Sequence, residues 1–349
     1  MVQITPYTLK GDINMQKIAI IGVKESTSYE LLNLLSESSF DPKDIIAVDY
    51  KSPLGTVVSY GQDDELDVKT LETFDFKSCE IAVFCASKEI SSKYIKSAIS
   101  ANCKVLDLSG ATFSDSSVPS IIPEINGNAV TSSTNVIAIP SSMTYQVLLP
   151  LATTLKNNTL NRLVINAYVS TSHYGRLAMD ELFTQSRKIF LNESLADNEQ
   201  IFKKQIAFNV LPQVGEFIGE ETSLEWQLNA EIKKVLNTNI KVHANASFVP
   251  TFIGDGVFVN AEFADEVDAS IIKDEMATTK GVVVFDKNVD GGYVSVDDIQ
   301  GEDNVYVSRI RQDISVENGI SYWSVLDNLR AGSAKLALSV LLKYFIKHS

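Results

Sequence analysis

The sequence predicts an α/β protein with two domains: a doubly wound parallel sheet, followed by an α+β domain with a mixed sheet. At about 150 residues per domain, a chain of 349 residues suggests two domains. In the first part of the chain, short β-branched apolar runs alternate with helical stretches, which indicates βαβ crossovers. After residue 240, long strands follow one another with few helices between them, which indicates mixed or antiparallel pairing.

The parallel sheet is predicted from a series of short strands. The first run, over residues 17–22, stops at a glycine, which is typical of a buried parallel strand. A helix with a leucine-rich face follows near residues 31–35, and a second helix is expected around 91–101. The other predicted strands cover residues 45–49, 81–85, 105–108 and 136–139.

The second domain is expected to begin with a helix over 143–155 and a half-buried strand over 163–170. A further helix begins near Gly175, and the sheet of long strands presents an outer face that a second subunit could cover. The amphipathic segment 328–347 is expected to pack back onto the first domain. We therefore assign residues 1–142 to the first domain, completed by the C-terminal helix 328–349, and residues 143–327 to the second.

Composition excludes several classes of function. The chain is 45% hydrophobic and 21% charged, as soluble globular proteins are, and its formal net charge of −14 disfavours nucleic acid and membrane surfaces as partners. No apolar run is long enough to span a bilayer. Its three cysteines are expected to be buried thiols in a reducing cytoplasm, and three histidines make a metal site improbable. We expect a cytoplasmic protein.

The turn after the first predicted strand is the first candidate site. A Rossmann-type dinucleotide site needs glycines there, because the backbone must approach the pyrophosphate at a helix N-terminus. Gly22 fills the first position, but Glu25 and Ser28 stand at the second and third. The carboxylate of Glu25 would repel a pyrophosphate, although Lys24 would offset part of this repulsion. We favour a βαβ unit kept for its fold.

Six separated blocks of the sequence form one pattern: VPSIIPEIN (118–126), Pro140 with 142–146, AMDELFTQS (178–186), QIAFNVLPQV (205–214), VSRIRQD (307–313) and WSVLDNLRAGSA (323–334). In their order and spacing, these blocks resemble the aspartate-semialdehyde dehydrogenase family. The resemblance extends from about Met15 to the C-terminus, so residues 1–14 precede the usual start of the family. Within the family, the chain is most similar to the catalytically degenerate Usg-type paralogues of bacteria.

The reaction of this amino-acid biosynthesis family implies a cysteine nucleophile and a histidine acid–base catalyst, with NADP as cofactor. In the block that resembles N-P-N-C-S-T-x-Q, the cysteine position is Ser142. A hydroxyl is much harder to activate than a thiol without a strong base. In the block that resembles V-P-V-F-Y-G-H, the histidine position is Asp255, a poor proton shuttle at neutral pH unless its pKa is strongly perturbed.

The resemblance also places the other site residues of the family. The orienting glutamine corresponds to Val169, and the two arginines that bind substrate carboxylate and phosphate correspond to Phe248 and Phe113. The glutamate–lysine pair of the substrate loop corresponds to Glu225 and Gln227. Replacing arginine by phenylalanine removes a bidentate partner for a carboxylate. The family residues that persist are Glu225 in the substrate loop and Ser172, Gly175 and Asn328 on the cofactor side. Arg309 and Arg311 also persist, and we interpret them as structural.

These replacements favour a non-catalytic protein, a pseudoenzyme with a binding or regulatory role. The resemblance implies a homodimer, and a protein partner is a further possibility. One alternative is an oxidoreductase that acts on an aldehyde or acyl substrate with NADP by altered chemistry, in which Ser142 or Asp255 reacts and His173 or His243 supplies a base. The other alternative is an active enzyme whose catalytic groups have moved to new positions. Such a move is difficult for the thiol, because Cys103 is the last cysteine and the second domain therefore contains none.

Overall fold

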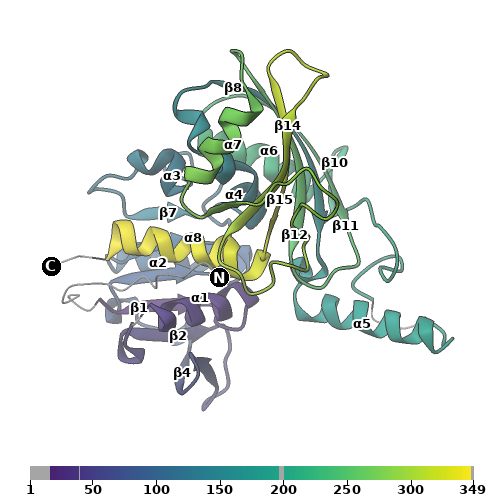
Figure 1. The fold of residues 1–349 in the computed structure, drawn as a ribbon. Coiled ribbons are helices and arrows are strands. Elements are labelled where there is room, and N and C mark those ends of the chain that lie inside the picture. Colours follow the sequence, from purple (N-terminus) through teal and green to yellow (C-terminus); the bar gives the residue numbers. More distant parts are fainter. Residues whose placement is uncertain (1–15, 39, 196–199, 347–349) are drawn as a thin grey trace. The chain divides into compact units, whose positions relative to one another are not determined.

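The computed structural model describes residues 16–38, 40–195 and 200–346, and the chain divides into two compact units (Figure 1). Unit 1 comprises residues 1–140 and 333–349, and unit 2 comprises residues 141–332. The expectation for residues 1–14 lies outside the described residues. In the part of the chain that is described, no helix is long and apolar enough to cross a membrane.

Unit 1 is built on a seven-stranded sheet in the order β3-β4-β2-β1-β5-β6-β7. All its neighbouring strands are parallel except the β3–β4 hairpin. Every residue of the central strand β1 is buried, as in parallel sheets that are covered on both faces. The strands are β1 (Ile18–Ile21), β2 (Ile45–Asp49), β3 (Val57–Tyr60), β4 (Asp64–Thr70), β5 (Ile81–Phe84), β6 (Lys104–Asp107) and β7 (Val136–Ala138). The doubly wound sheet predicted from the sequence is confirmed.

The described helices of unit 1 are α1 (Ser26–Glu37), α2 (Lys88–Ser100), α3 (Pro123–Asn126) and α8 (Lys335–Val340). Helix α8 packs against α1, so the C-terminal segment does return to the first sheet (Figure 1). The predicted helix from Asn328 onward is interrupted, however, because Gly332 has non-helical backbone angles. A Cβ atom at Gly332 would lie 2.2 Å from the Oγ of Ser142, so only glycine permits this close approach.

Unit 2 contains a six-stranded mixed sheet in the order β11-β8-β12-β15-β14-β13. The β11–β8 and β13–β14 pairs are parallel and the others antiparallel, which confirms the predicted mixed sheet. A separate hairpin joins β9 (Phe217–Ile218) to β10 (Glu221–Thr222). The strands of the main sheet are β8 (Leu160–Val169), β11 (Lys241–Phe248), β12 (Asp255–Phe263), β13 (Val282–Val284), β14 (Val305–Gln312) and β15 (Gly319–Leu326).

One face of the second sheet is covered by helices, and the other is open. Along β8, buried apolar residues alternate with partly exposed ones, so that Tyr168 lies on the open face. The described helices of unit 2 are α4 (Ser142–Leu148), α5 (Arg176–Phe190), α6 (Ser223–Leu236) and α7 (Ala269–Thr278), and α4, α6 and α7 contact the sheet. The helix predicted over 143–155 ends at Leu148 and continues only as short 3-10 turns around Pro150, which has no backbone N–H to donate.

Candidate functional site

Asp255 lies at the start of β12 with only 2% of its surface exposed. Its Oδ1 accepts hydrogen bonds of 2.9 Å from the backbone N–H and from the hydroxyl of Ser170. Burial raises the pKa of Asp255 to about 6, although the two hydrogen bonds from Ser170 act in the opposite direction. The carboxyl group of Asp255 is therefore held inside the protein by the chain that follows β8.

The side chain of Asn328 closes this network. Its Oδ1 accepts from the hydroxyl of Ser172 at 3.0 Å and from the backbone N–H of Gly254 at 3.0 Å. The hydroxyl of Ser170 also lies 3.3 Å from the same oxygen. Asn328, Ser172 and Asp255 are all buried, so the polar groups in this part of unit 2 bond mainly to one another.

Ser142 is the first residue of α4, directly after the N-cap residue Ser141. Its Oγ donates a hydrogen bond of 3.0 Å to the backbone carbonyl of Asn328. The backbone at Gly332 packs directly against the side chain of Ser142. A hydroxyl that donates to a carbonyl is not a hydroxyl whose proton is removed by a base.

Glu231, on α6, occupies the N-terminus of α4 and was not identified from the sequence. Its Oε2 accepts from the backbone N–H of Ser141 at 3.0 Å and from the hydroxyls of Ser141 and Thr144, each at 2.6 Å. A helix N-terminus favours an anion, and here the anion is a side chain that is only 5% exposed. The sequence signal was weak, because Glu231 is one acidic residue within an amphipathic helix.

Aromatic side chains surround Phe248 at the end of β11. The Phe248 ring lies 4.7 Å from the ring of Tyr174 and 5.1 Å from that of Phe202, measured between ring centres. His173 packs on the same cluster, at 6.2 Å from Phe248 and 5.8 Å from Tyr174. Phe248 is 1% exposed whereas Tyr174 is 39% exposed, so the cluster buries the Phe248 ring beneath rings that reach the surface.

In unit 1, the turn that begins at Gly22 is stabilised by hydrogen bonds and an ion pair from neighbouring side chains. Gly22 has a φ of +89°, and a Cβ atom there would lie 2.6 Å from the backbone of Ala86. The hydroxyl of Ser28 donates to the carbonyl of Gly22 at 2.7 Å. Lys24 pairs with Asp49 at 2.9 Å and contacts the hydroxyl of Ser52 at 3.3 Å, so its charge is already matched.

Comparison with known proteins identifies the family. The profile described as "Semialdehyde dehydrogenase, NAD binding domain" matches residues 17–133, and "Semialdehyde dehydrogenase, dimerisation domain" matches residues 148–331. Aspartate-semialdehyde dehydrogenase from Rickettsia bellii is 37% identical over 91% of this chain and 94% of its own length. The chain belongs to the aspartate-semialdehyde dehydrogenase family.

Solved structures support the same assignment. The crystal structure of aspartate semialdehyde dehydrogenase II from Vibrio cholerae is 29% identical, covers 95% of this chain and all of its own, and superposes with a TM-score of 0.88. A probable aspartate-semialdehyde dehydrogenase from Pseudomonas aeruginosa gives a TM-score of 0.84 at 27% identity, over 95% of this chain and 99% of its own. The two-domain fold of the aspartate-semialdehyde dehydrogenase family is therefore present over nearly the whole chain.

The two predicted positions of the family's substrate loop have internal partners in this chain. Glu225 completes a capping box on α6, where its Oε2 accepts from the backbone N–H of Thr222 at 2.7 Å. Its Oε1 accepts from the backbone N–H of Ala246 on β11 at 3.0 Å. Gln227 donates to Oε1 of Glu231 at 2.8 Å and so supports the carboxylate at the N-terminus of α4.

The remaining sequence-predicted positions of unit 2 lie close to these groups. Val169 is the last residue of β8, is fully buried, and pairs in register with Phe248. Gly175, with a φ of +77°, is the N-cap residue of α5. Another buried residue that sequence reasoning missed is Gln146, whose Nε2 donates to the carbonyls of Asp255 and Ser324, each at 2.9 Å.

Two predicted site positions lie in unit 1: Phe113, at the position of the family's phosphate-binding arginine, and Glu25, on the cofactor side. Phe113 is half-buried in the turn after β6, and its backbone N–H donates to the carbonyl of Gly110. Glu25 is the N-cap residue of α1, and its side chain makes no capping hydrogen bond. Burial and the nearby charge of Asp49 raise the pKa of Glu25. The family's NAD-binding domain thus carries a carboxyl group beside the helix end that would receive a pyrophosphate.

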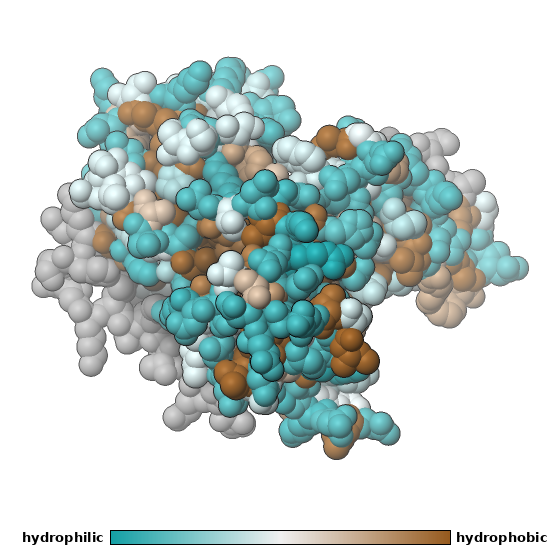
Figure 2. Space-filling model, turned by 90° about the horizontal axis from the view of Figure 1, so that it is seen from above, coloured by the Kyte–Doolittle hydropathy of each residue, from teal (hydrophilic) through white to brown (hydrophobic). Residues whose placement is uncertain are grey.

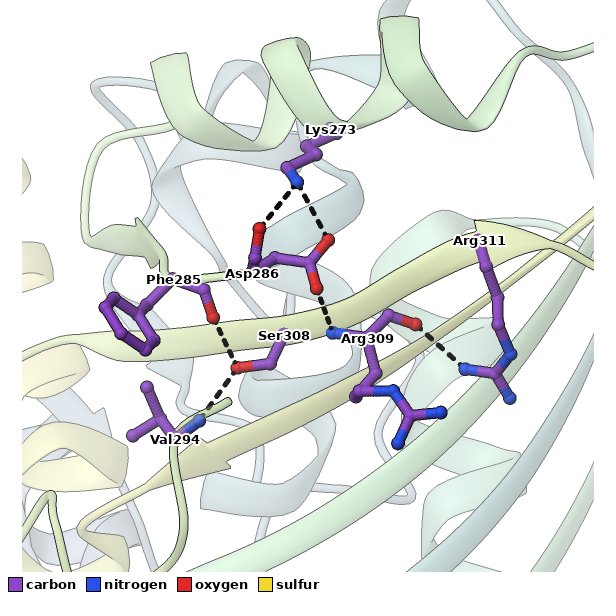
Figure 3. A network of polar contacts seen from close by, with 7 residues as sticks. All are labelled: Lys273, Phe285, Asp286, Val294, Ser308, Arg309 and Arg311. Atoms are coloured by element: carbon purple, nitrogen blue, oxygen red, sulfur yellow. Dashed lines mark hydrogen bonds and ion pairs between the residues drawn. The ribbon is translucent and has the colours of Figure 1, made fainter. Parts of the chain in front are cut away.

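Within the part of the chain that the structure describes, Arg309 and Arg311 form no ion pair that joins two strands. Arg309 lies in a bulge of β14 with a φ of +57°, and its backbone N–H donates to Asp286, which in turn pairs with Lys273 (Figure 3). Arg311 donates to the carbonyl of Arg309 at 2.8 Å. Among the described residues, the guanidinium of Arg309 has no ion-pair partner, and it lines the open sheet face beside Trp323.

Proposed function

We propose that this chain is a catalytically inactive member of the aspartate-semialdehyde dehydrogenase family, of the kind found among the Usg-type paralogues. It acts as a cytoplasmic homodimer with a binding or regulatory role. The observation that carries this proposal is that the polar groups at the family's reactive positions form hydrogen bonds within this chain. Asp255 accepts a hydrogen bond from Ser170, and Ser142 donates one to the carbonyl of Asn328. The N-terminus of α4, where Ser142 lies, donates to the carboxylate of Glu231.

The substrate side of the proposed degenerate site supports the same conclusion. A substrate carboxylate needs a cationic partner, and the position of the family arginine holds Phe248 inside an aromatic cluster. The position of the orienting glutamine holds Val169, which has no polar side-chain atom. Glu225 bonds to two backbone N–H groups, which leaves it less able to receive a substrate ammonium group.

The deciding experiment is an assay of NADP reduction with aspartate semialdehyde and phosphate, with an active family enzyme assayed in parallel. We expect no phosphate-dependent formation of NADPH above the rate without protein. Thermal unfolding of the same preparation shows that the protein is folded. Phosphate-dependent turnover that survives further purification would overturn the proposal.

A second candidate function is an oxidoreductase of this family with altered chemistry on an aldehyde or acyl substrate, using NADP. The observation that favours it is Asp255, because a carboxyl with a pKa of about 6 exchanges a proton near neutral pH. A screen of aldehydes and acyl phosphates with NADP or NADPH tests this idea. Any activity found should be lost in both Ser142→Ala and Asp255→Asn, and activity retained in both variants would eliminate this candidate.

The homodimer rests on the matched dimerisation domain and on two apolar regions of unit 2, one partly exposed and one exposed. On the open sheet face, the ring of Phe258 lies 4.7 Å from Trp323, and the ring of Tyr168 lies 5.9 Å from Trp323. On α5, Phe183 and Phe190 are 61% and 79% exposed, and brown apolar atoms are visible at the right of Figure 2, where α5 lies. Such surfaces mark protein interfaces.

Sedimentation equilibrium measures the oligomeric state directly. We expect a dimer for the unmodified chain and a shift toward monomer for Trp323→Asp, which places a charge on the open face. The matched control is Ile314→Asp, because Ile314 is almost fully exposed and lies beyond the end of β14. A monomer for the unmodified chain would contradict the dimer, and equal dimer stability in all three proteins would place the interface elsewhere.

A further inference from the structure

The thiols of Cys79 and Cys103 lie side by side in unit 1. Cys79 ends the 3-10 turn Phe76–Ser78, just before β5, and Cys103 directly precedes β6. These strands are parallel neighbours, with Ile81 opposite Lys104. The two Sγ atoms are 3.8 Å apart, and both side chains are more than nine-tenths buried.

We propose that Cys79 and Cys103 are a redox-sensitive pair, which hydroperoxides convert to a disulfide without disturbing the sheet. The register places Cys79 one position beyond the residue opposite Cys103. With a strand spacing of about 4.8 Å and a rise of about 3.3 Å per residue, the diagonal Cα separation is about 6 Å, which lies within the range that disulfides span. An S–S bond of about 2.05 Å requires the sulfur atoms to approach by less than about 2 Å. Side-chain rotation supplies a movement of this size, so the backbone can keep its register.

The hydrogen bonds around the pair distinguish the two thiols. Both thiols also lie near the backbone carbonyl of Phe76, at 3.4 Å from Cys79 and 3.2 Å from Cys103. The contact between the two thiols lowers the pKa of Cys103 and raises the pKa of Cys79. Because the thiolate is the nucleophile, Cys103 is the residue that attacks the oxidant and Cys79 the one that resolves it.

The reaction proceeds in two balanced steps. The Cys103 thiolate attacks one oxygen of the hydroperoxide, the O–O bond breaks, and the products are a sulfenic acid on Cys103 and an alcohol, or water when the oxidant is hydrogen peroxide. The Cys79 sulfur then attacks the Cys103 sulfur, an S–S bond forms, and water leaves. Two electrons pass from the thiols to the peroxide, and the two thiol protons end in the released products.

A hollow on the surface of unit 1 lies one residue away from the buried pair. The hollow has a volume of about 430 Å³ and lies between the segment 74–77 and the last turns of α2. Phe76, which carries the carbonyl shared by the two thiols, lines this hollow, so a small oxidant can approach within one residue of the pair. Cys85, by contrast, follows β5 at its other end, and it serves as the internal control.

The experiment treats the full chain with hydrogen peroxide, blocks the remaining thiols, digests with trypsin and identifies linked peptides by mass spectrometry. Cleavage after lysine gives peptide 78–88, which holds both Cys79 and Cys85, and peptide 97–104, which holds Cys103. We expect these two peptides to be linked with the loss of two hydrogen atoms. The Cys85→Ala variant should give the same linkage, which assigns it to Cys79.

Two further variants test the order of events. In Cys79→Ser, a sulfenic acid should accumulate on Cys103 and be captured by dimedone, whereas Cys103→Ser should give neither product. In the unmodified chain, closing the loop between residues 79 and 103 should raise the unfolding midpoint by roughly 5 °C, reversed by dithiothreitol. Modification of Cys85 alone, or of Cys103 without any linkage in the unmodified chain, would overturn the proposal. If a variant does not fold, the linked peptide of the unmodified chain decides.

Discussion

Asp255 and Ser170 are 85 positions apart in the chain, yet the Asp255 carboxyl accepts both hydrogen bonds that Ser170 can donate, each at 2.9 Å. This contact joins the start of β12 to the segment after β8 and positions the buried Asn328 beside it. A carboxyl with these partners stabilises the local structure when it is protonated. Its ionised form must be accommodated against the cost of burial.

The pH dependence of stability follows from that contact. Because the pKa of Asp255 is raised from 3.8 to about 6, the folded state binds its proton more tightly than the unfolded state. The Asp255 carboxyl therefore contributes favourably to the free energy of unfolding below pH 4, by at most about 3 kcal/mol. This contribution is lost as the pH rises through 6. Asp255→Asn should remove this dependence and unfold at higher denaturant concentration than the unmodified chain at pH 7.

Urea unfolding between pH 4 and pH 8 checks this prediction. The control is Asp265→Asn, which changes an exposed carboxyl on the same unit and should leave the dependence intact. The two curves should converge near pH 4, where Asp255 is protonated. A constant difference between Asp255→Asn and the unmodified chain at every pH would assign its effect to packing instead of ionisation.

The carboxylate of Glu231 is the second feature that can be tested. It accepts three hydrogen bonds at the N-terminus of α4, and Glu231→Gln removes the charge while keeping the shape. We expect a loss of about 1–3 kcal/mol in the free energy of unfolding, because the donors lose a charged partner. Gln227→Ala, which removes only the contact to the other carboxylate oxygen, should cost less than about 1 kcal/mol. Equal losses would show that the helix end does not depend on the charge.

Local pattern in the sequence predicted both types of sheet and five of the seven strands of the first, but it missed β3 and β4, whose residues are mostly exposed. The strand of residues 18–21 is an uninterrupted apolar run, and alternation along β8 indicated its half-buried setting. The contacts of the candidate site depend instead on residues far apart in the chain. Glu231 and Ser141 are 90 positions apart, and no local signal pairs them. The break at Gly332 has the same origin, since it depends on the packing of Ser142.

The aromatic cluster around Phe248 predicts which substitutions the chain tolerates. Phe248→Ala should cost about 3–5 kcal/mol, because it leaves a cavity among Tyr174, Phe202 and His173. Phe248→Arg should cost at least as much, because the guanidinium would be buried without an acidic partner. The control is Phe252→Ala, a change at a side chain that is 43% exposed. Thermal unfolding measures all three, and a Phe248→Arg variant as stable as the unmodified chain would show that an anion can reach this position.

Binding of NADP tests the role assigned to Glu25. We expect millimolar NADP to leave the unfolding midpoint of the unmodified chain unchanged, because the Glu25 carboxyl stands at the N-terminus of α1. Glu25→Gly removes that carboxyl, and the extended backbone at Glu25 accepts glycine without rearrangement. A ligand at a hundredfold excess over its dissociation constant should then raise the midpoint by roughly 2 °C or more.

The matched variant Glu25→Gln separates charge from shape, since it removes the charge and keeps the side chain. A shift with Gly but not with Gln would mean that the pyrophosphate needs close approach of the backbone. A shift with both would mean that repulsion alone had prevented binding. If the unmodified chain shifts as much as Glu25→Gly, the NAD-binding domain still takes its nucleotide, and the inactive-enzyme proposal would then rest on unit 2 alone.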